Sequence, residues 1–187
     1  MYGVIALFEE EAEKEIAEIW RVLCERGISY YSKEIPSRKP HITIASYENI
    51  EVESLIKDMD RFVHSQTSIP ITLSAFGTFL GSSTLFLSPI PSNELLTFHQ
   101  SYHEYFRRYN DNPSSLYLPG KWVPHCTIAN HLTEEKFYEA FQHCKEMMKP
   151  IETSINQLAL IKLEYENNEC IDAPILFSKT MTKRMMN

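Results

Sequence analysis

Glycine is scarce in this sequence, with five glycines in 187 residues. They form neither the GxGxxG pattern of dinucleotide-binding loops nor the GxxxxGK[ST] pattern of nucleoside-triphosphate loops. Both patterns need closely spaced glycines, because the backbone must approach a phosphate without a side chain in the way. The sequence therefore excludes the Rossmann and P-loop classes.

Cysteine is also scarce, and no two cysteines stand in a CxxC pair. Their spacing fits neither a zinc ribbon nor the disulfide framework of a small secreted domain. We therefore expect reduced thiols at the four positions, which are Cys24, Cys126, Cys144 and Cys170.

Long apolar runs are missing as well, since no stretch approaches the roughly 18 to 20 residues that a membrane-spanning helix needs. The first residues, MYGVIALFEEE, place acid directly after a short apolar run. They lack the basic segment and the cleavage site of a signal peptide. We therefore expect a cytoplasmic protein without a membrane partner.

Basic residues are fewer than acidic ones: the chain has 18 Lys and Arg and 25 Asp and Glu, which gives a formal net charge of −7. A protein that coats long nucleic acid usually has a basic face, because its affinity comes from counterions released from the phosphates. This balance argues against binding of long duplex nucleic acid. An acidic protein can still hold one phosphate in a small basic pocket, so a small nucleotide or an RNA terminus remains a candidate ligand.

The hydrophobic pattern predicts helices and strands in an order that repeats. The helices are expected at about residues 9–26, 52–63, 92–109 and 133–149. The strands are expected, after a first one at residues 2–8, at about 28–31, 41–46, 69–79, 84–89, 125–130, 153–165 and 174–181. The order of elements in residues 2–80 is approximately repeated in residues 84–181. We therefore predict an α+β fold of duplicated split βαβ character, a single bilobal domain over 1–187 with approximate lobes 1–80 and 84–187.

One hexapeptide occurs twice, 84 residues apart, with five of six letters unchanged. The copies are Pro40-His41-Ile42-Thr43-Ile44-Ala45 and Pro124-His125-Cys126-Thr127-Ile128-Ala129. Each lies in an expected strand that leads into a helix, and each follows an irregular segment, 32–40 or 110–121. This agreement of letters and context indicates an internal duplication.

The repeated strand can carry chemistry on one face. Side chains at i and i+2 of a strand project from the same side, so each copy presents an imidazole and a hydroxyl together while its apolar residues point into a core. If the two copies face each other, His41 and His125 can act as base and acid on a phosphodiester. The hydroxyls of Thr43 and Thr127 can then donate to the phosphate oxygens.

The two tetrads His41-Ile42-Thr43-Ile44 and His125-Cys126-Thr127-Ile128 resemble the paired HxT motifs of the two-histidine (2H) phosphoesterase superfamily. That superfamily includes 2′-5′ RNA ligase-like proteins and RNA 2′,3′-cyclic phosphodiesterases. The resemblance implies two antiparallel-rich sheets facing a central cleft, a metal-independent site without a cofactor, and attack on a 2′,3′-cyclic phosphate or a 2′-5′ linkage. It also implies catalytic roles for His41 and His125 and phosphate-binding roles for Thr43 and Thr127.

Residues next to the two motifs are candidates for substrate binding. Basic side chains there could neutralise a phosphate, and aromatic side chains could stack on a base. The alternative is that the charges are ordinary loop charges and that the tryptophan packs between the lobes. The candidates are Arg38, Lys39, Tyr47, Tyr117, Lys121 and Trp122.

His99 and His103 stand at i and i+4 of an expected helix, a spacing that can hold a metal ion. The sequence offers no convincing third ligand nearby, so we predict no metal site.

Three functions remain open at this point. The first is a hydrolase that cleaves a cyclic phosphate or a 2′-5′ phosphodiester on a nucleotide or RNA end. The second is a 2′-5′ RNA ligase, and the third is a module that binds RNA ends or nucleotides without turnover.

Overall fold

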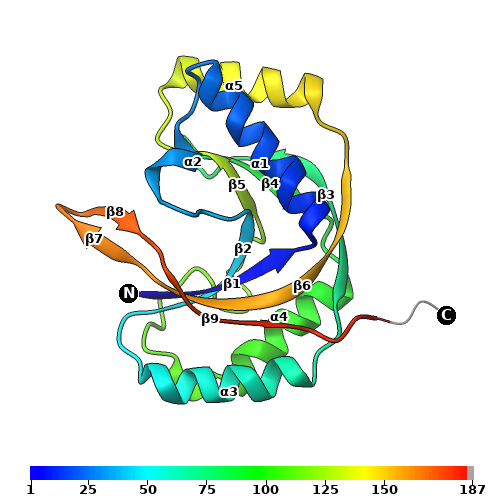
Figure 1. The fold of residues 1–187 in the computed structure, drawn as a ribbon, viewed down its shortest axis with the longest axis vertical. Coiled ribbons are helices and arrows are strands. Elements are labelled where there is room, and N and C mark those ends of the chain that lie inside the picture. Colours follow the sequence, from blue (N-terminus) through cyan, green and yellow to red (C-terminus); the bar gives the residue numbers. More distant parts are fainter. Residues whose placement is uncertain (185–187) are drawn as a thin grey trace.

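The computed structural model describes residues 1–184 as an α+β protein, which confirms the expected class (Figure 1). Seven strands form one sheet in which all pairings are antiparallel: β1 (Tyr2–Phe8), β2 (His41–Tyr47), β3 (Ile69–Gly77), β4 (Leu85–Pro89), β5 (Cys126–Ala129), β6 (Ile151–Lys162) and β9 (Ile175–Thr180). A separate hairpin consists of β7 (Glu164–Glu166) and β8 (Glu169–Asp172). The helices are α1 (Glu10–Glu25), α2 (Tyr31–Glu34), α3 (Val52–His64), α4 (Asn93–Tyr105), the 3₁₀ turn η1 (Arg107–Tyr109) and α5 (Glu134–Met147).

Strand β6 joins the two halves of the sheet. The strand order is β2-β1-β6-β3-β4-β5, and β9 also pairs with β6. Ile155 of β6 pairs with Phe8 of β1 and with Ile69 of β3. The two expected sheets are therefore continuous through β6. Strands from the two halves of the sequence are not separated in this sheet, because β6 lies between β1 and β3.

The helices lie in two groups. Figure 1 shows α1 and α5 in the upper part with β4 and β5, and α3 and α4 in the lower part. Helix α1 contacts β5, α5 contacts β4, and α3 contacts β9. The strands β2 and β5, which end the strand order on either side, also contact each other. This contact brings the two copies of the repeated hexapeptide together.

The strand expected at residues 28–31 is wrong, because this segment caps α1. Gly27 adopts a positive φ of 65°, and the N–H of Ile28 donates to the carbonyl of Leu23 at 2.9 Å. This is the bond pattern of a helix that ends on glycine, followed by a hydrophobic residue that packs back on the helix. Ile28 is buried for that reason, and α2 begins at Tyr31.

The strand expected to run to residue 165 also ends earlier, since β6 stops at Lys162. The chain then forms the hairpin of β7 and β8, whose turn contains Asn167 and Asn168 with φ values of 50° and 65°. Asparagine tolerates positive φ better than most residues, so Asn-Asn is a suitable turn for a tight hairpin. This local signal could have been used to predict the hairpin.

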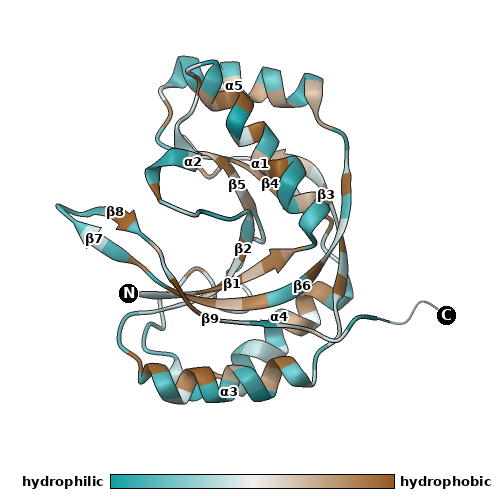
Figure 2. Ribbon diagram, viewed as in Figure 1, coloured by the Kyte–Doolittle hydropathy of each residue, from teal (hydrophilic) through white to brown (hydrophobic). Residues whose placement is uncertain are grey.

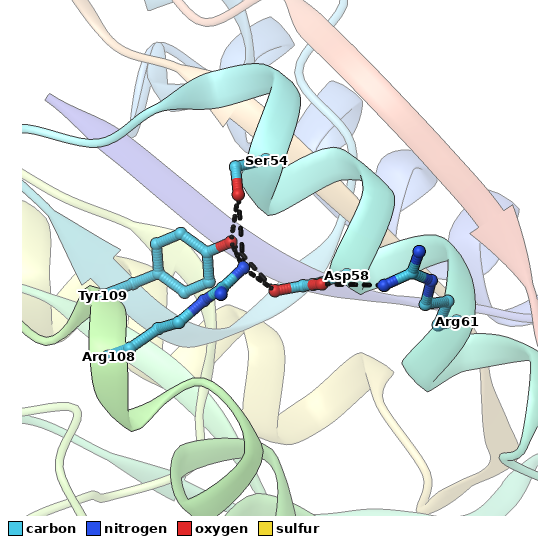
Figure 3. A network of polar contacts seen from close by, with 5 residues as sticks. All are labelled: Ser54, Asp58, Arg61, Arg108 and Tyr109. Carbon is cyan, nitrogen blue, oxygen red and sulfur yellow. Dashed lines mark hydrogen bonds and ion pairs between the residues drawn. The ribbon is translucent and has the colours of Figure 1, made fainter.

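A polar network ties α3 to the turn after α4 (Figure 3). Asp58 accepts hydrogen bonds from the Tyr109 hydroxyl, at 2.9 Å, and from the Arg108 guanidinium. Ser54 contacts the Tyr109 hydroxyl at 2.9 Å. These contacts fix the start of the irregular segment 110–121, which leads to the second hexapeptide.

The helices carry both hydrophilic and hydrophobic residues (Figure 2). Their hydrophobic residues join those of the sheet in one large core that includes Ile16, Leu55, Tyr102 and Leu160. A second, smaller cluster consists of Ile5, Leu7, Ala159 and Ile161. Within residues 1–184, no helix combines the length and hydrophobicity that crossing a membrane requires.

Candidate active site

The two repeated strands have the predicted alternation of side chains. Ile42 and Ile44 are fully buried, whereas His41 and Thr43 are partly exposed. The second copy repeats this pattern, with Cys126 and Ile128 buried and His125 and Thr127 partly exposed. Each copy therefore presents one imidazole and one hydroxyl on the side of the strand away from the core. The buried thiol of Cys126 belongs to the core, where burial raises its pKa to about 12.

Both imidazoles are held in the same way. Nδ1 of His41 lies 2.7 Å from the carbonyl of Lys39, and Nδ1 of His125 lies 2.7 Å from the carbonyl of Val123. A carbonyl only accepts, so each Nδ1 must carry the hydrogen. In a neutral ring the lone pair is then on Nε2, which can accept a proton, and in a charged ring Nε2 can donate one.

Burial lowers the pKa of both imidazoles. Burial lowers the pKa of His41 below its usual value, and the charges of Arg38 and His125 act in the same direction, while the Lys39 carbonyl opposes them. Burial also lowers the pKa of His125, and the Val123 carbonyl opposes this shift. At neutral pH the free protein therefore holds both imidazoles mainly in the neutral form.

Two tryptophans donate hydrogen bonds to the backbone of the two motifs. The indole N–H of Trp122 donates to the carbonyl of Thr43 at 2.9 Å. The indole N–H of Trp20 donates to the carbonyl of Thr127 at 3.2 Å. Each motif strand is thus held by a tryptophan from a different part of the chain. The substrate-binding candidates included only residues next to the motifs, so the sequence analysis missed Trp20.

Two tyrosines face the threonine hydroxyls. Burial raises the pKa of Tyr117, and a hydrogen bond with the Thr43 side chain acts in the opposite direction. Burial likewise raises the pKa of Tyr31, with the Arg38 charge and a hydrogen bond with the Thr127 side chain opposing it. Both phenols line the same cavity. The sequence analysis missed Tyr31. Tyr31 precedes the first motif by about as many residues as Tyr117 precedes the second, and this equivalence could have been used to predict it.

The cavity beside the first motif has a volume of about 1100 Å³, and its walls include His41, Thr43 and Arg38. The Arg38 side chain is only 10% exposed. Its guanidinium lies 3.7 Å from the centre of the Tyr31 ring and 3.4 Å from the Glu34 carboxylate. One guanidinium nitrogen, Nη1, is buried without a hydrogen-bond partner. A buried cation with a free donor is suited to an anionic ligand.

The structure brings some candidate residues to the cavity and places others elsewhere. Arg38, Lys39 and Tyr117 line it, but the Lys39 ammonium is paired with Glu13 at 3.1 Å. Lys121 donates to a backbone carbonyl in its own loop, that of Pro113.

Two of the aromatic candidates for base stacking pack against other side chains of the protein. Tyr47 is buried, and its hydroxyl contacts that of Tyr102 at 3.0 Å, so its ring is not accessible to a ligand. Trp122 stacks on the His99 ring with centroids 3.8 Å apart, which agrees with the packing alternative.

His99 and His103 hold backbone segments near the site. Nε2 of His99 donates to the carbonyl of Tyr117 at 2.9 Å, and Nε2 of His103 donates to that of Ile44 at 3.1 Å. Burial, together with the neighbouring His103, lowers the pKa of His99 to about 4. Among residues 1–184, no three His, Cys, Asp or Glu side chains are grouped so that they could hold a metal ion. The histidine pair therefore supports the Tyr117 loop and the first motif strand.

Comparisons with known proteins agree with this architecture. The model of the 2′-5′ RNA ligase superfamily matches residues 8–167. No curated protein matches the chain.

Solved structures are similar over nearly the whole chain. A phosphoesterase has a TM-score of 0.61 and 15% identity over 97% of each chain. Escherichia coli LigT complexed with 3′-AMP has a TM-score of 0.59 and 14% identity over 97% of this chain and 96% of LigT. TT0787 of Thermus thermophilus has a TM-score of 0.57 and 15% identity over 98% of this chain and 99% of that one. At these identities the likeness shows the fold.

Proposed function

The chain belongs to the 2′-5′ RNA ligase superfamily, and from this premise we propose that it hydrolyses a phosphodiester on a nucleotide or RNA end. The proposed substrate is a 2′,3′-cyclic phosphate or a 2′-5′ linkage. One observation carries the proposal: two equivalent histidines each donate Nδ1–H to a backbone carbonyl, His41 at the start of β2 and His125 directly before β5, and these two strands contact each other. Such a pair suits acid–base catalysis, in which one imidazole takes a proton while the other gives one.

In the proposed reaction, water attacks the phosphorus and one imidazole Nε2 accepts the proton that water loses. The other ring, as imidazolium, donates its Nε2 proton to the departing 2′ or 3′ oxygen as the P–O bond breaks. For a cyclic phosphate the product is a phosphomonoester with a free hydroxyl on the neighbouring carbon. The hydroxyls of Thr43 and Thr127 would donate to the non-bridging oxygens, whose charge increases in the transition state.

The ligands bound in structures of one similar protein support the proposal that the substrate is a small nucleotide. LigT structures are described with 3′-AMP, NADP+, ATP and phosphate. Arg38 is the group of this chain that suits such a phosphate best, because its Nη1 is buried and without a partner beside His41. The 3′-phosphate of 3′-AMP is also the group that would form on opening a 2′,3′-cyclic phosphate at its 2′ oxygen.

The direct test is turnover of defined substrates. We expect the protein to hydrolyse 2′,3′-cyclic mononucleotides or 2′-5′ dinucleotides in the presence of excess EDTA, with products separated by anion-exchange chromatography. Incubation of RNA ends carrying a 2′,3′-cyclic phosphate and a 5′-hydroxyl, followed by electrophoresis, detects joining. Joined products without hydrolysis would favour the ligase, and tight binding without any product would favour a non-catalytic module. Loss of turnover with EDTA would contradict the metal-independent mechanism.

The rate should depend on pH in a direction set by the two histidines. Both pKa values lie below the usual value of 6.5, so the imidazolium that serves as acid becomes rarer as pH rises above that value. The value of kcat/KM, which reports the free enzyme, should therefore follow a bell whose maximum lies below about pH 6.5. Well above it, kcat/KM should fall about tenfold per pH unit. A maximum above about pH 7 in a full pH–rate profile would be incompatible with neutral resting histidines.

A further inference from the structure

The cavity continues far beyond the proposed phosphate position. Its walls run from His41 and Thr43 to the hairpin of β7 and β8 and to Ile175 at the start of β9. Pockets for drug-sized ligands have volumes of roughly 300 to 1000 Å³, and this one has about 1100 Å³. A phosphate with its sugar would fill only a part of this space. The rest of the wall is therefore a place for another part of the ligand.

This part of the wall carries several exposed apolar side chains beside the polar Asn168 and Glu169. Four large hydrophobic side chains that are exposed to solvent line the cavity: Leu116, Tyr165, Ile171 and Ile175. Ile5 and Ile161 also contribute, and both belong to the small hydrophobic cluster separate from the main core. Exposed apolar side chains gathered in one hollow mark a binding surface, whereas single exposed ones need no explanation.

The cavity has little positive charge left for further phosphates. Its two basic side chains that are charged at neutral pH are Arg38 and Lys39, and they lie against Glu34 and Glu13. The buried Nη1 of Arg38 has no hydrogen-bond partner. Each phosphate of an RNA chain gains affinity from a cation, and the whole protein has a net charge of −7. The cavity therefore suits one phosphate group and not a polynucleotide chain.

We propose that the ligand of this site is a small phosphate ester with a single phosphate and a large apolar group. The phosphate lies at Arg38, His41 and Thr43, and the apolar group lies against Ile171 and Ile175. The placement of the phosphate rests on the proposed function, whereas the apolar wall stands on its own lining. The continuity of the cavity from His41 to Ile175 selects the ligand's own apolar group as the occupant, in preference to a separate partner.

The test uses binding, so that it does not depend on turnover. Isothermal calorimetry with the whole protein compares 3′-AMP, its N6-benzyl derivative, and a tetranucleotide with a 3′-phosphate. We expect the benzyl derivative to bind roughly tenfold more tightly than 3′-AMP, because it buries additional apolar surface. The tetranucleotide should bind no more tightly than 3′-AMP at about 150 mM salt, because its added phosphates meet no cation.

A matched pair of variants locates the effect. Ile175 and Leu176 are neighbours on β9 and similarly exposed, at 43% and 39%, but only Ile175 lines the cavity. The benzyl advantage is the factor by which the N6-benzyl derivative binds more tightly than 3′-AMP. We expect Ile175→Ser to reduce this factor below about threefold and Leu176→Ser to leave it unchanged.

Several results would overturn the inference. These are a benzyl advantage below about twofold, equal effects of both serine variants, a tetranucleotide bound about ten times more tightly than 3′-AMP, or no binding of any of the three compounds. A dimer that Ile175→Ser disrupts, without change in the benzyl advantage, would assign the apolar wall to a second copy of the chain. Binding as expected without turnover of any cyclic phosphate would contradict the proposed function and leave this inference standing.

Discussion

Replacing His41 or His125 by asparagine is expected to lower kcat for a cyclic phosphate at least about a hundredfold. Asparagine can still donate a hydrogen bond to the carbonyl of Lys39 or Val123, as Nδ1 does in the native protein. It has no group that accepts and returns a proton, so the chemical step loses its base or its acid. Binding of 3′-AMP should weaken less than about threefold. Steady-state kinetics and calorimetry on the same samples separate the two effects.

The control for this pair is His64→Asn. His64 ends α3, is exposed and does not line the cavity, so its replacement should leave kcat unchanged. The double variant His41→Asn/His125→Asn should be little worse than either single variant, because residues that act as one unit lose their joint effect together. A reduction of less than about tenfold in either single variant would remove that histidine from the reaction.

Replacing Arg38 by methionine is expected to weaken the binding of 3′-AMP roughly 10- to 100-fold. Methionine keeps an unbranched apolar stem against the Tyr31 ring but removes the guanidinium, whose Nη1 is buried and without a partner. Hydrogen bonds to charged groups contribute about 1.5 to 3 kcal/mol each, which corresponds to this range. The same variant should raise the pKa of His41, because the Arg38 charge lowers it in the native protein. Calorimetry measures the first effect and NMR titration of the imidazole the second.

Lys39→Met is the comparison for Arg38→Met. Lys39 is the next residue and also lines the cavity, but its side chain is 44% exposed and its ammonium is paired with Glu13. Exposed ion pairs contribute little, so 3′-AMP binding should change less than about threefold. Equal losses in the two variants would mean that general positive charge, and not the buried guanidinium, attracts the phosphate.

The chemistry of the motifs could be predicted from the sequence because it depends on local spacing. The i, i+2 relation of His41 to Thr43 fixes their common face, and the buried Ile42 and Ile44 fix the opposite one. The four long helices were predicted for the same reason, since a periodic apolar face is a property of neighbouring residues, whereas the short α2 was not predicted. The strand prediction for residues 28–31 was wrong because Ile28, which caps α1, looks like the start of a strand when only hydrophobicity is considered.

What the sequence could not give is the pairing of distant segments. The hydrogen bonds from Trp20 to Thr127 and from Trp122 to Thr43 span 107 and 79 residues. The first bond exists because α1 contacts β5, and the second because β2 and β5, at opposite ends of the strand order, contact each other. The same holds for Tyr31, which reaches the second motif from the segment before the first. No local periodicity carries such information.

The central claim is that His41 and His125 act on one phosphate. The most direct measurement is a crystal structure of the protein with 3′-AMP. Nε2 of both histidines should lie within about 3.2 Å of oxygen atoms of the same phosphate or of the adjacent 2′ oxygen. A phosphate held by one histidine alone, or bound away from both rings, would contradict the proposed function.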